Sequence, residues 1–215
     1  VPLTEQFQEQ GIRQIELDVF YDPEGGHYSE HQALTLFDED PASGIPELDV
    51  PGYKVLHVQE IDYETTCFTL VSCLEELKLW SDANPNHLPI MVLIEAKDEE
   101  IADPLSLGFA VPLPIDTAAL DALDAEIRTV FSSAQLIVPD DVRADAPTLE
   151  SAVLDGGWPA LSDARGKIMF GLDNGGEIKA SYIAGHSSLA GRVMFTDSDP
   201  GTPEAAFMKQ NNPLA

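Results

Sequence analysis

Four polar residues stand late in three apolar segments that we expect to form strands. Glu16 and Asp18 are separated by one residue, so both side chains project from the same face of an expected strand at 13–20. His57 lies late in the second apolar segment and Glu95 late in the third. Three carboxylates gathered in one place repel one another, which raises their pKa values unless a cation holds them. The pattern therefore predicts a site for a divalent cation with a histidine beside it.

Carboxylates without sulfur or clustered imidazoles are the ligands of a hard cation, Ca2+ or Mg2+, rather than of zinc. Such an ion can polarise a phosphoryl oxygen and acidify a coordinated hydroxyl. A histidine that titrates near neutral pH can then transfer protons. Lys97 stands two positions after Glu95 and so faces the same way. A hard cation, a histidine and a lysine together favour the cleavage of a phosphodiester.

Strand-like and helix-like segments alternate along the chain, which is typical of an α/β protein with parallel strands. We expect helices from about residue 66 to 84, at 117–131 and at 147–155, and parallel strands at 13–20, 53–59, 89–97, 134–138, 167–173 and 192–197. No glycine-rich phosphate loop follows the first strand, which disfavours a doubly wound nucleotide-binding fold. A (β/α)8-type barrel fits better, and barrels of this kind carry their chemistry at the carboxyl ends of the strands. Six strands leave such a barrel incomplete.

Composition excludes several classes of function. The 215 residues favour one domain, and 38 Asp and Glu against 11 Lys and Arg give a formal net charge of -27. No basic face can replace the counterions of a nucleic acid, so nucleic-acid binding is excluded. No apolar run approaches the roughly 18–20 residues that cross a bilayer, so we expect no transmembrane segment.

Cys67 and Cys73 are six positions apart and are the only cysteines of the chain. This spacing is neither that of a redox motif nor that of a zinc finger. It suits one small disulfide loop formed in an oxidising compartment. Two buried free thiols are the alternative that the sequence leaves open.

Four stretches carry a family resemblance. They are RQIELDVFYDPEGG, GYKVLHVQEIDYETTCFTLVSCLEELKLWSDANPNHLPIMVLIEAKD, KIMFGLDN and YIAGHSSLAGRVMFTDSDPGTPEAAFMKQNNP. Together they resemble the Ca2+-dependent phosphoinositide-specific phospholipase C family of bacteria and fungi. The resemblance implies a phospholipase C-like phosphodiesterase domain over residues 1–215, folded as a distorted (β/α)8 TIM-type barrel, and a secreted protein.

The resemblance also implies roles for individual residues. Glu16, Asp18 and Glu95 match the family's Ca2+ ligands, and Lys97 matches a contact to phosphate or inositol. His57 matches one member of a catalytic histidine pair. The implied reaction is attack on phosphorus by the inositol 2-hydroxyl of a phosphatidylinositol-type phospholipid at a membrane surface. Its products are diacylglycerol and a cyclic inositol phosphate.

The family pattern extends beyond this sequence at both ends. An earlier strand of the family supplies the other histidine and an asparagine ligand, and a last strand contacts the substrate, so we expect the barrel to be truncated at both ends here. A glycerophosphodiester phosphodiesterase, a phospholipase D-like enzyme on the same barrel, or a non-catalytic Ca2+-binding and headgroup-binding relic are the alternatives. Asp173, at the end of the strand 167–173, either belongs to the active site or caps the turn after it.

Overall fold

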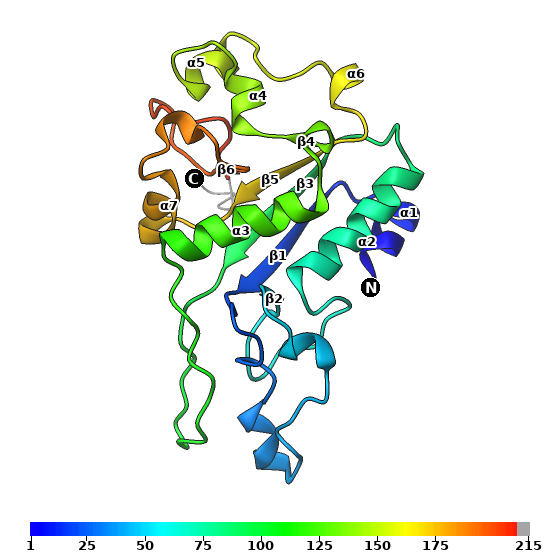
Figure 1. Ribbon diagram of the computed structural model, residues 1–215, viewed down its shortest axis with the longest axis vertical. Coiled ribbons are helices and arrows are strands. Elements are labelled where there is room, and N and C mark those ends of the chain that lie inside the picture. The colour runs from blue at the N-terminus through cyan, green and yellow to red at the C-terminus, as the bar shows by residue number, and fades with distance from the viewer. Residues whose placement is uncertain (210–215) are drawn as a thin grey trace, which may run out of the picture. The chain divides into compact units, whose positions relative to one another are not determined.

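The computed structural model describes residues 1–209, and its elements follow the apolar pattern of the sequence (Figure 1). The strands are β1 (Gln14–Phe20), β2 (Lys54–Val55), β3 (Ile90–Ala96), β4 (Leu136–Ile137), β5 (Ile168–Leu172) and β6 (Met194–Thr196). The α-helices are α1 (Leu3–Glu9), α2 (Leu70–Ala83), α3 (Thr117–Val130), α4 (Pro139–Arg143), α5 (Leu149–Leu154), α6 (Leu161–Ala164) and α7 (Gly176–Ile183). The short 3-10 helices are η1 (Gln32–Phe37), η2 (Pro46–Asp49), η3 (Ser133–Gln135) and η4 (Ser187–Leu189).

Two compact units make up the described chain. The first comprises Val1–Ile12, Leu17–Trp80 and Ala96–Val130, and the second comprises Arg13–Glu16, Ser81–Glu95 and the chain from Phe131 onward. The boundaries fall inside β1 and β3, so each of these strands belongs to both units. The prediction of one domain over residues 1–215 stays a prediction.

The second unit is built on parallel strands. Strand β5 pairs in parallel with β3, β4 and β6 (Figure 1). Strands β3 and β5 bury long apolar runs, as strands covered on both faces do. At Gly171 a Cβ atom would lie 2.6 Å from the Cε of Met91, so the side chains of the neighbouring strand fill the space above this glycine. The predicted α/β class with parallel strands is confirmed.

Strand β3 also runs parallel to β1. The Met91 N–H donates to the Arg13 carbonyl at 2.9 Å, and the Lys97 N–H donates to the Val19 carbonyl at 2.8 Å. The Met91–Arg13 bond lies within the second unit, and the Lys97–Val19 bond lies within the first unit. In both pairs the two residues are separated by the same number of positions in the sequence. Strands β1 and β3 are therefore neighbours in the sheet.

The expected parallel strand at 53–59 is wrong in length and direction. Strand β2 consists of Lys54 and Val55 and pairs antiparallel to β1. The reason lies after Val55, where the N–H groups of His57 and Val58 both donate to the Asp62 carbonyl in a tight turn. Those bonds occupy the backbone groups that a longer strand would use.

Side chains cap the starts of the predicted helices. Helix α2 begins at Leu70 rather than near residue 66, because Thr69 Oγ1 accepts from the Ser72 N–H at 3.1 Å. Helix α3 begins after Asp116, whose carboxylate accepts from the Ala119 N–H at 2.9 Å. Within residues 1–209, no helix is both long and apolar enough to span a membrane.

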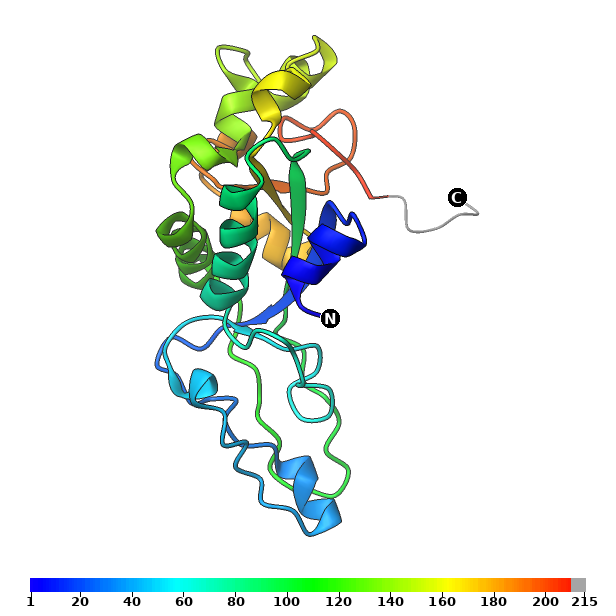
Figure 2. The ribbon, with the colours of Figure 1, turned by 90° about the vertical axis from the view of Figure 1, so that its right-hand side faces the viewer.

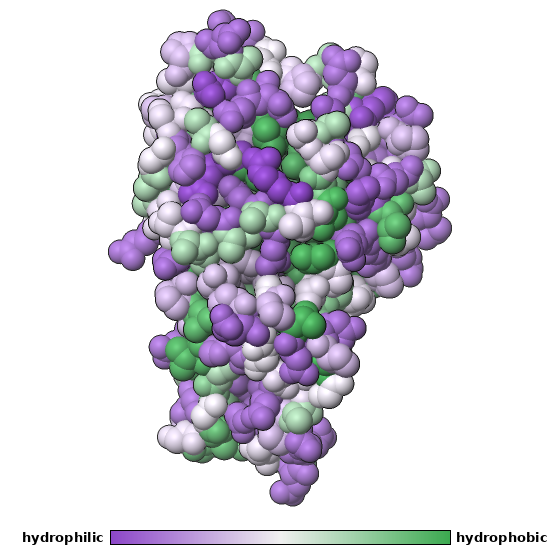
Figure 3. Space-filling model, in the orientation of Figure 1, coloured by the Kyte–Doolittle hydropathy of each residue, from purple (hydrophilic) through white to green (hydrophobic). Residues whose placement is uncertain are grey.

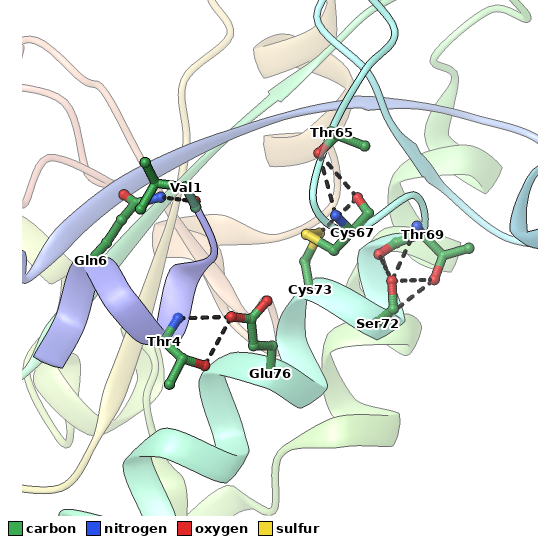
Figure 4. Close-up of a disulfide and its surroundings, with 9 residues drawn as sticks. All are labelled: Val1, Thr4, Gln6, Thr65, Cys67, Thr69, Ser72, Cys73 and Glu76. Atoms are coloured by element: carbon green, nitrogen blue, oxygen red, sulfur yellow. Dashed lines mark hydrogen bonds between the residues drawn. A yellow bond between two sulfur atoms is a disulfide. The ribbon is translucent and has the colours of Figure 1, made fainter.

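The first unit builds its own core from strand ends and loops. The buried residues Phe20, Tyr28, Leu48 and Leu56 pack together, with Ala110 of the loop after β3 against them. Helices α1 and α2 contact each other: the rings of Phe7 and Trp80 are 5.3 Å apart, and Thr4 Oγ1 donates to Glu76 Oε1 at 2.8 Å (Figures 2 and 4). Apolar packing thus helps to hold the loops of the first unit, and the loop before α2 also pairs with β2, where the Val55 N–H donates to the Phe68 carbonyl at 3.0 Å.

Cys67 and Cys73 form a disulfide, so the first of the two alternatives for the cysteines is confirmed (Figure 4). Their Cα atoms are 5.2 Å apart. The bond ties the loop before α2 to the first turn of that helix, beside the Thr69–Ser72 cap.

Removing this disulfide should destabilise the fold. Closing so short a loop lowers the conformational entropy of the unfolded chain, which raises the free energy of unfolding by about 2 kcal/mol. We expect the double variant Cys67→Ser/Cys73→Ser to lose that amount in the free energy of unfolding, measured by urea denaturation. Reduced wild-type protein should match the variant, and reductant should leave the variant unchanged. Equal stability of oxidised and reduced wild-type protein would show that the bond contributes nothing.

Candidate metal site

Strand alternation places two carboxylates on one face of β1. Ile15, Leu17 and Val19 are buried on the other face, so Glu16 and Asp18 point away from that core. On β3, Glu95 stands between the buried Ile94 and Ala96 and is half-buried itself. Each of the three acidic residues is therefore oriented by apolar neighbours on its own strand.

The carboxylates of Glu16, Asp18 and Glu95 come together. Each offers an oxygen, and these oxygens all lie within 4.8 Å of one another. Glu16 is exposed, whereas Asp18 and Glu95 are half-buried. Such a set of hard oxygen donors fits Ca2+, which takes 6–8 oxygens in a flexible geometry and can complete its shell with water or substrate. The chemistry of the donors thus agrees with a Ca2+ site.

Lys97, directly after β3, lies next to this cluster. Its Nζ is 3.3 Å from Asp18 Oδ2, and both side chains are largely buried. The ammonium offsets part of the negative charge of the cluster. The structure therefore brings four of the five predicted site residues together.

The surroundings of His57 differ from those of the other predicted site residues. It stands in the tight turn after β2, and its side chain is 66% exposed. Its Nδ1 lies 2.6 Å from Asp62 Oδ2 across that turn. Among residues 1–209, the group of potential metal ligands does not include His57. The Asp62 carboxylate thus orients the imidazole ring of His57.

A cavity of about 300 Å³ in the second unit is lined by residues that the sequence did not clearly indicate as functional. Glu16 lines it together with Asp173 and Lys209. Lys209 Nζ forms an ion pair with Asp173 Oδ2 at 2.5 Å, while the buried Asp173 Oδ1 has no hydrogen-bond partner among residues 1–209. Helix α7 has Gly175 as its N-cap and no side-chain cap bond. Asp173 therefore lines a cavity beside Glu16, and Gly175 rather than Asp173 is the N-cap of α7.

Two other histidines are parts of the core. His31 is fully buried, its ring stacks on Tyr63 at a centroid distance of 3.5 Å, and its Nδ1 lies 2.9 Å from the Gln59 carbonyl oxygen. His87 is buried too, with its Nε2 2.7 Å from Ser81 Oγ. Burial lowers the pKa of both rings, because a buried imidazolium loses hydration.

The buried His31 should make the protein sensitive to mild acid. The unfolded chain protonates this ring near its ordinary pKa of 6.5, whereas the folded chain does so only at lower pH. The contribution of His31 to stability is therefore complete above the unfolded pKa of 6.5 and is lost as the pH falls from there through the lower, folded pKa. We expect the free energy of unfolding to fall less between pH 7.5 and 5 in His31→Gln than in the wild type. Parallel curves for the two proteins would contradict this.

Comparison with known proteins places this geometry in a family. The model of the family described as "Phosphoinositide phospholipase C, Ca2+-dependent" matches residues 1–215. A comparison with curated proteins finds no match. One similar solved structure is the calcium-dependent phosphoinositol-specific phospholipase C of Pseudomonas sp. in its apo form, crystal form 2. It has 20% identity and a TM-score of 0.56 over 86% of this chain and 56% of that chain.

A second similar structure is the Ca2+-dependent phosphatidylinositol-specific phospholipase C of Streptomyces antibioticus. It has 23% identity and a TM-score of 0.57 over 91% of this chain and 61% of that chain. The chain thus spans less than two thirds of the length of these structures. At such identities they show that the fold is shared. The family match over the whole sequence shows more: the chain belongs to the Ca2+-dependent phosphoinositide phospholipase C family.

Proposed function

We propose that the protein containing this chain cleaves phosphatidylinositol-type phospholipid in a Ca2+-dependent reaction that yields diacylglycerol and a cyclic inositol phosphate. The observation that carries the proposal is the convergence of Glu16, Asp18 and Glu95 in a chain of this family. These carboxylates would hold Ca2+. When bound, the ion would acidify the attacking inositol hydroxyl and offset charge on the phosphate.

His57 would transfer protons in this reaction. A neutral ring that donates Nδ1–H to Asp62 presents Nε2 to the substrate. Protonated at Nε2, it would donate a proton to the diacylglycerol oxygen as the bond from that oxygen to phosphorus breaks. Asp62 would hold the ring in this tautomer and orientation. A second proton-transfer group, expected from the earlier strand of the family, stays a prediction.

Lys97 would contact the phosphate or the inositol ring. Its ammonium already lies beside the carboxylate of Asp18, with which the cation would also interact. An anionic headgroup would approach a strongly acidic protein, so a fixed cationic side chain next to the metal ligands favours that approach.

The barrel and the extracellular location belong to the same proposal. The shared fold with bacterial phospholipases C supports a distorted (β/α)8 barrel. The Cys67–Cys73 disulfide supports secretion, because such bonds persist in oxidising compartments.

Product analysis tests the proposal against its alternatives. The full-length protein is incubated with phosphatidylinositol vesicles and, separately, with deacylated glycerophosphoinositol, each with Ca2+. We expect diacylglycerol and cyclic inositol phosphate from the vesicles. Phosphatidic acid would indicate a phospholipase D-like reaction, and cleavage restricted to the deacylated compound would indicate a glycerophosphodiester phosphodiesterase. Ca2+ binding without any cleavage would indicate the non-catalytic relic.

A further inference from the structure

The turn 58–62, which follows His57 and ends at Asp62, is not held by a long strand. Between β1 and α2 the chain forms the short helices η1 and η2 and the strand β2, which has two residues. Polar and apolar side chains are mixed at the surface of these loops (lower part of Figure 3). Contacts inside the loops, rather than a long strand, therefore decide where the His57–Asp62 pair is placed.

One buried side chain contacts this turn from another loop. His31 stands just before η1, and its Nδ1 lies 2.9 Å from the carbonyl oxygen of Gln59, inside the turn. Its ring stacks on Tyr63, the residue after the turn, with 9° between the two ring planes. His31 therefore holds the turn both within it and at the residue that follows it.

Burial fixes the tautomer of His31. The ring is fully buried, and its Nε2 has no hydrogen-bond partner among residues 1–209. A proton on Nε2 would be a buried donor left unpaired, which is unfavourable. The proton therefore stays on Nδ1, which donates it to the Gln59 carbonyl. His31 is thus a neutral donor whose direction is set by its stacking on Tyr63.

The segments on both sides of this contact are anchored. The N–H of His31 donates to the Pro41 carbonyl at 2.7 Å, so the loop that carries the ring is itself fixed. Within the turn, the buried Glu60 accepts from the Ala33 N–H at 3.3 Å and from the Ala110 N–H at 2.8 Å. The turn is thus tied to two loops that are distant from it in the sequence.

The contact matters for the chemistry because His57 and Asp62 lie at the two ends of the turn. The N–H of His57 donates to the Asp62 carbonyl at 3.2 Å, and His57 Nδ1 lies 2.6 Å from Asp62 Oδ2. Gln59 stands between the two in the sequence, so a shift of its peptide would change how the two side chains meet. A displacement of about 1 Å in a reacting group can cost about 10²-fold in rate.

We propose that His31 is a positioning residue for the reaction: through its hydrogen bond to the Gln59 carbonyl, it fixes the turn that holds His57 against Asp62. This inference rests on the proposed function, because His57 is the residue to which that function gives the proton transfer. His31 is buried, and it acts through the turn.

Two substitutions separate the hydrogen bond of His31 from its packing. The amide nitrogen of asparagine, like Nδ1, is bonded to Cγ, so His31→Asn keeps a donor toward Gln59, whereas His31→Phe keeps the stacked ring and loses the donor. In the full-length protein we expect His31→Phe to lower kcat for phosphatidylinositol by about tenfold or more, with KM nearly unchanged. His31→Asn should keep most of the activity. The matched control is His87→Phe, which replaces another buried imidazole and should leave kcat unchanged.

A double-mutant cycle shows whether His31 acts through His57. If it does, His31→Phe should lower kcat in the wild-type background and should have no further effect in the His57→Ala background. A general loss of structure would lower kcat by the same factor in both backgrounds, and that result would overturn the proposal. Equal losses of kcat in His31→Phe and His31→Asn would overturn it as well.

The ring of His57 can also be followed without turnover. In full-length protein labelled with 15N-histidine, the resonances of this ring are identified by their absence in His57→Ala. We expect them to shift in His31→Phe and to keep their positions in His31→Asn and His87→Phe; resonances unchanged in His31→Phe would refute the positioning role. If they shift as expected but the protein cleaves no phosphoinositide, the positioning stands and the proposed function fails.

Discussion

Glu95→Gln will weaken Ca2+ binding by at least about 100-fold and will lower the rate of phosphatidylinositol cleavage at limiting Ca2+ in proportion. The substitution keeps the size of the side chain and removes one of three negative charges that lie within 4.8 Å of one another. Because Ca2+ is held by charge and oxygen count, the loss of a carboxylate is costly. Isothermal titration with Ca2+ and initial rates at several Ca2+ concentrations measure the two effects.

The same substitution distinguishes a metal site from a structural cluster. In chelator, three neighbouring carboxylates repel one another, so Glu95→Gln should unfold at the same temperature as the wild type or higher. With Ca2+ present, the wild type should gain more stability than the variant, because a ligand stabilises the state that binds it. The control is Glu75→Gln on the exposed face of α2. Unchanged Ca2+ affinity in Glu95→Gln would refute the assignment.

His57→Ala will lower the rate of cleavage by about 10²–10⁴-fold, the usual contribution of a positioned proton-transfer group. Its side chain is 66% exposed, so the temperature of unfolding should be nearly unchanged. Initial rates and thermal denaturation followed by circular dichroism measure the two quantities. His186→Ala, whose ring bonds to the Ala190 carbonyl, serves as the control and should retain activity.

Asp62→Asn tests the role given to the partner of His57. Asparagine can still contact Nδ1, 2.6 Å from the present carboxylate, but it does not enforce the same tautomer. We expect kcat to fall with little change in KM, and less than in His57→Ala. A variant with wild-type kcat would show that the contact only closes the turn. Full activity of His57→Ala would remove both residues from the mechanism.

Local periodicity predicted the elements that carry the cluster. The alternation of Ile15, Leu17 and Val19 with polar residues defined β1, and the apolar run before Glu95 defined β3. Because the carboxyl ends of adjacent parallel strands share one edge, the meeting of the three carboxylates followed from the strand assignment. The direct pairing of β1 with β3, with the antiparallel β2 on the other side of β1, did not follow from the local pattern.

Other parts depended on contacts that local sequence does not encode. Strand β2 was overestimated because the turn that ends it is closed by Asp62, several residues later. Helix α7 begins at Gly176, after a segment whose glycines indicated a turn. The ion pair of Asp173 with Lys209 joins residues that are 36 positions apart, so the local sequence around neither residue predicts it.

The dependence of cleavage on free Ca2+ tests whether Glu16, Asp18 and Glu95 hold the ion that the reaction needs. Release of diacylglycerol from phosphatidylinositol vesicles by the full-length wild-type protein is measured over a range of buffered Ca2+ concentrations and in chelator. We predict a saturable rise with Ca2+, no cleavage in chelator, and a curve displaced to higher Ca2+ in Glu16→Gln. Cleavage that proceeds unchanged in chelator would show that the reaction does not need Ca2+.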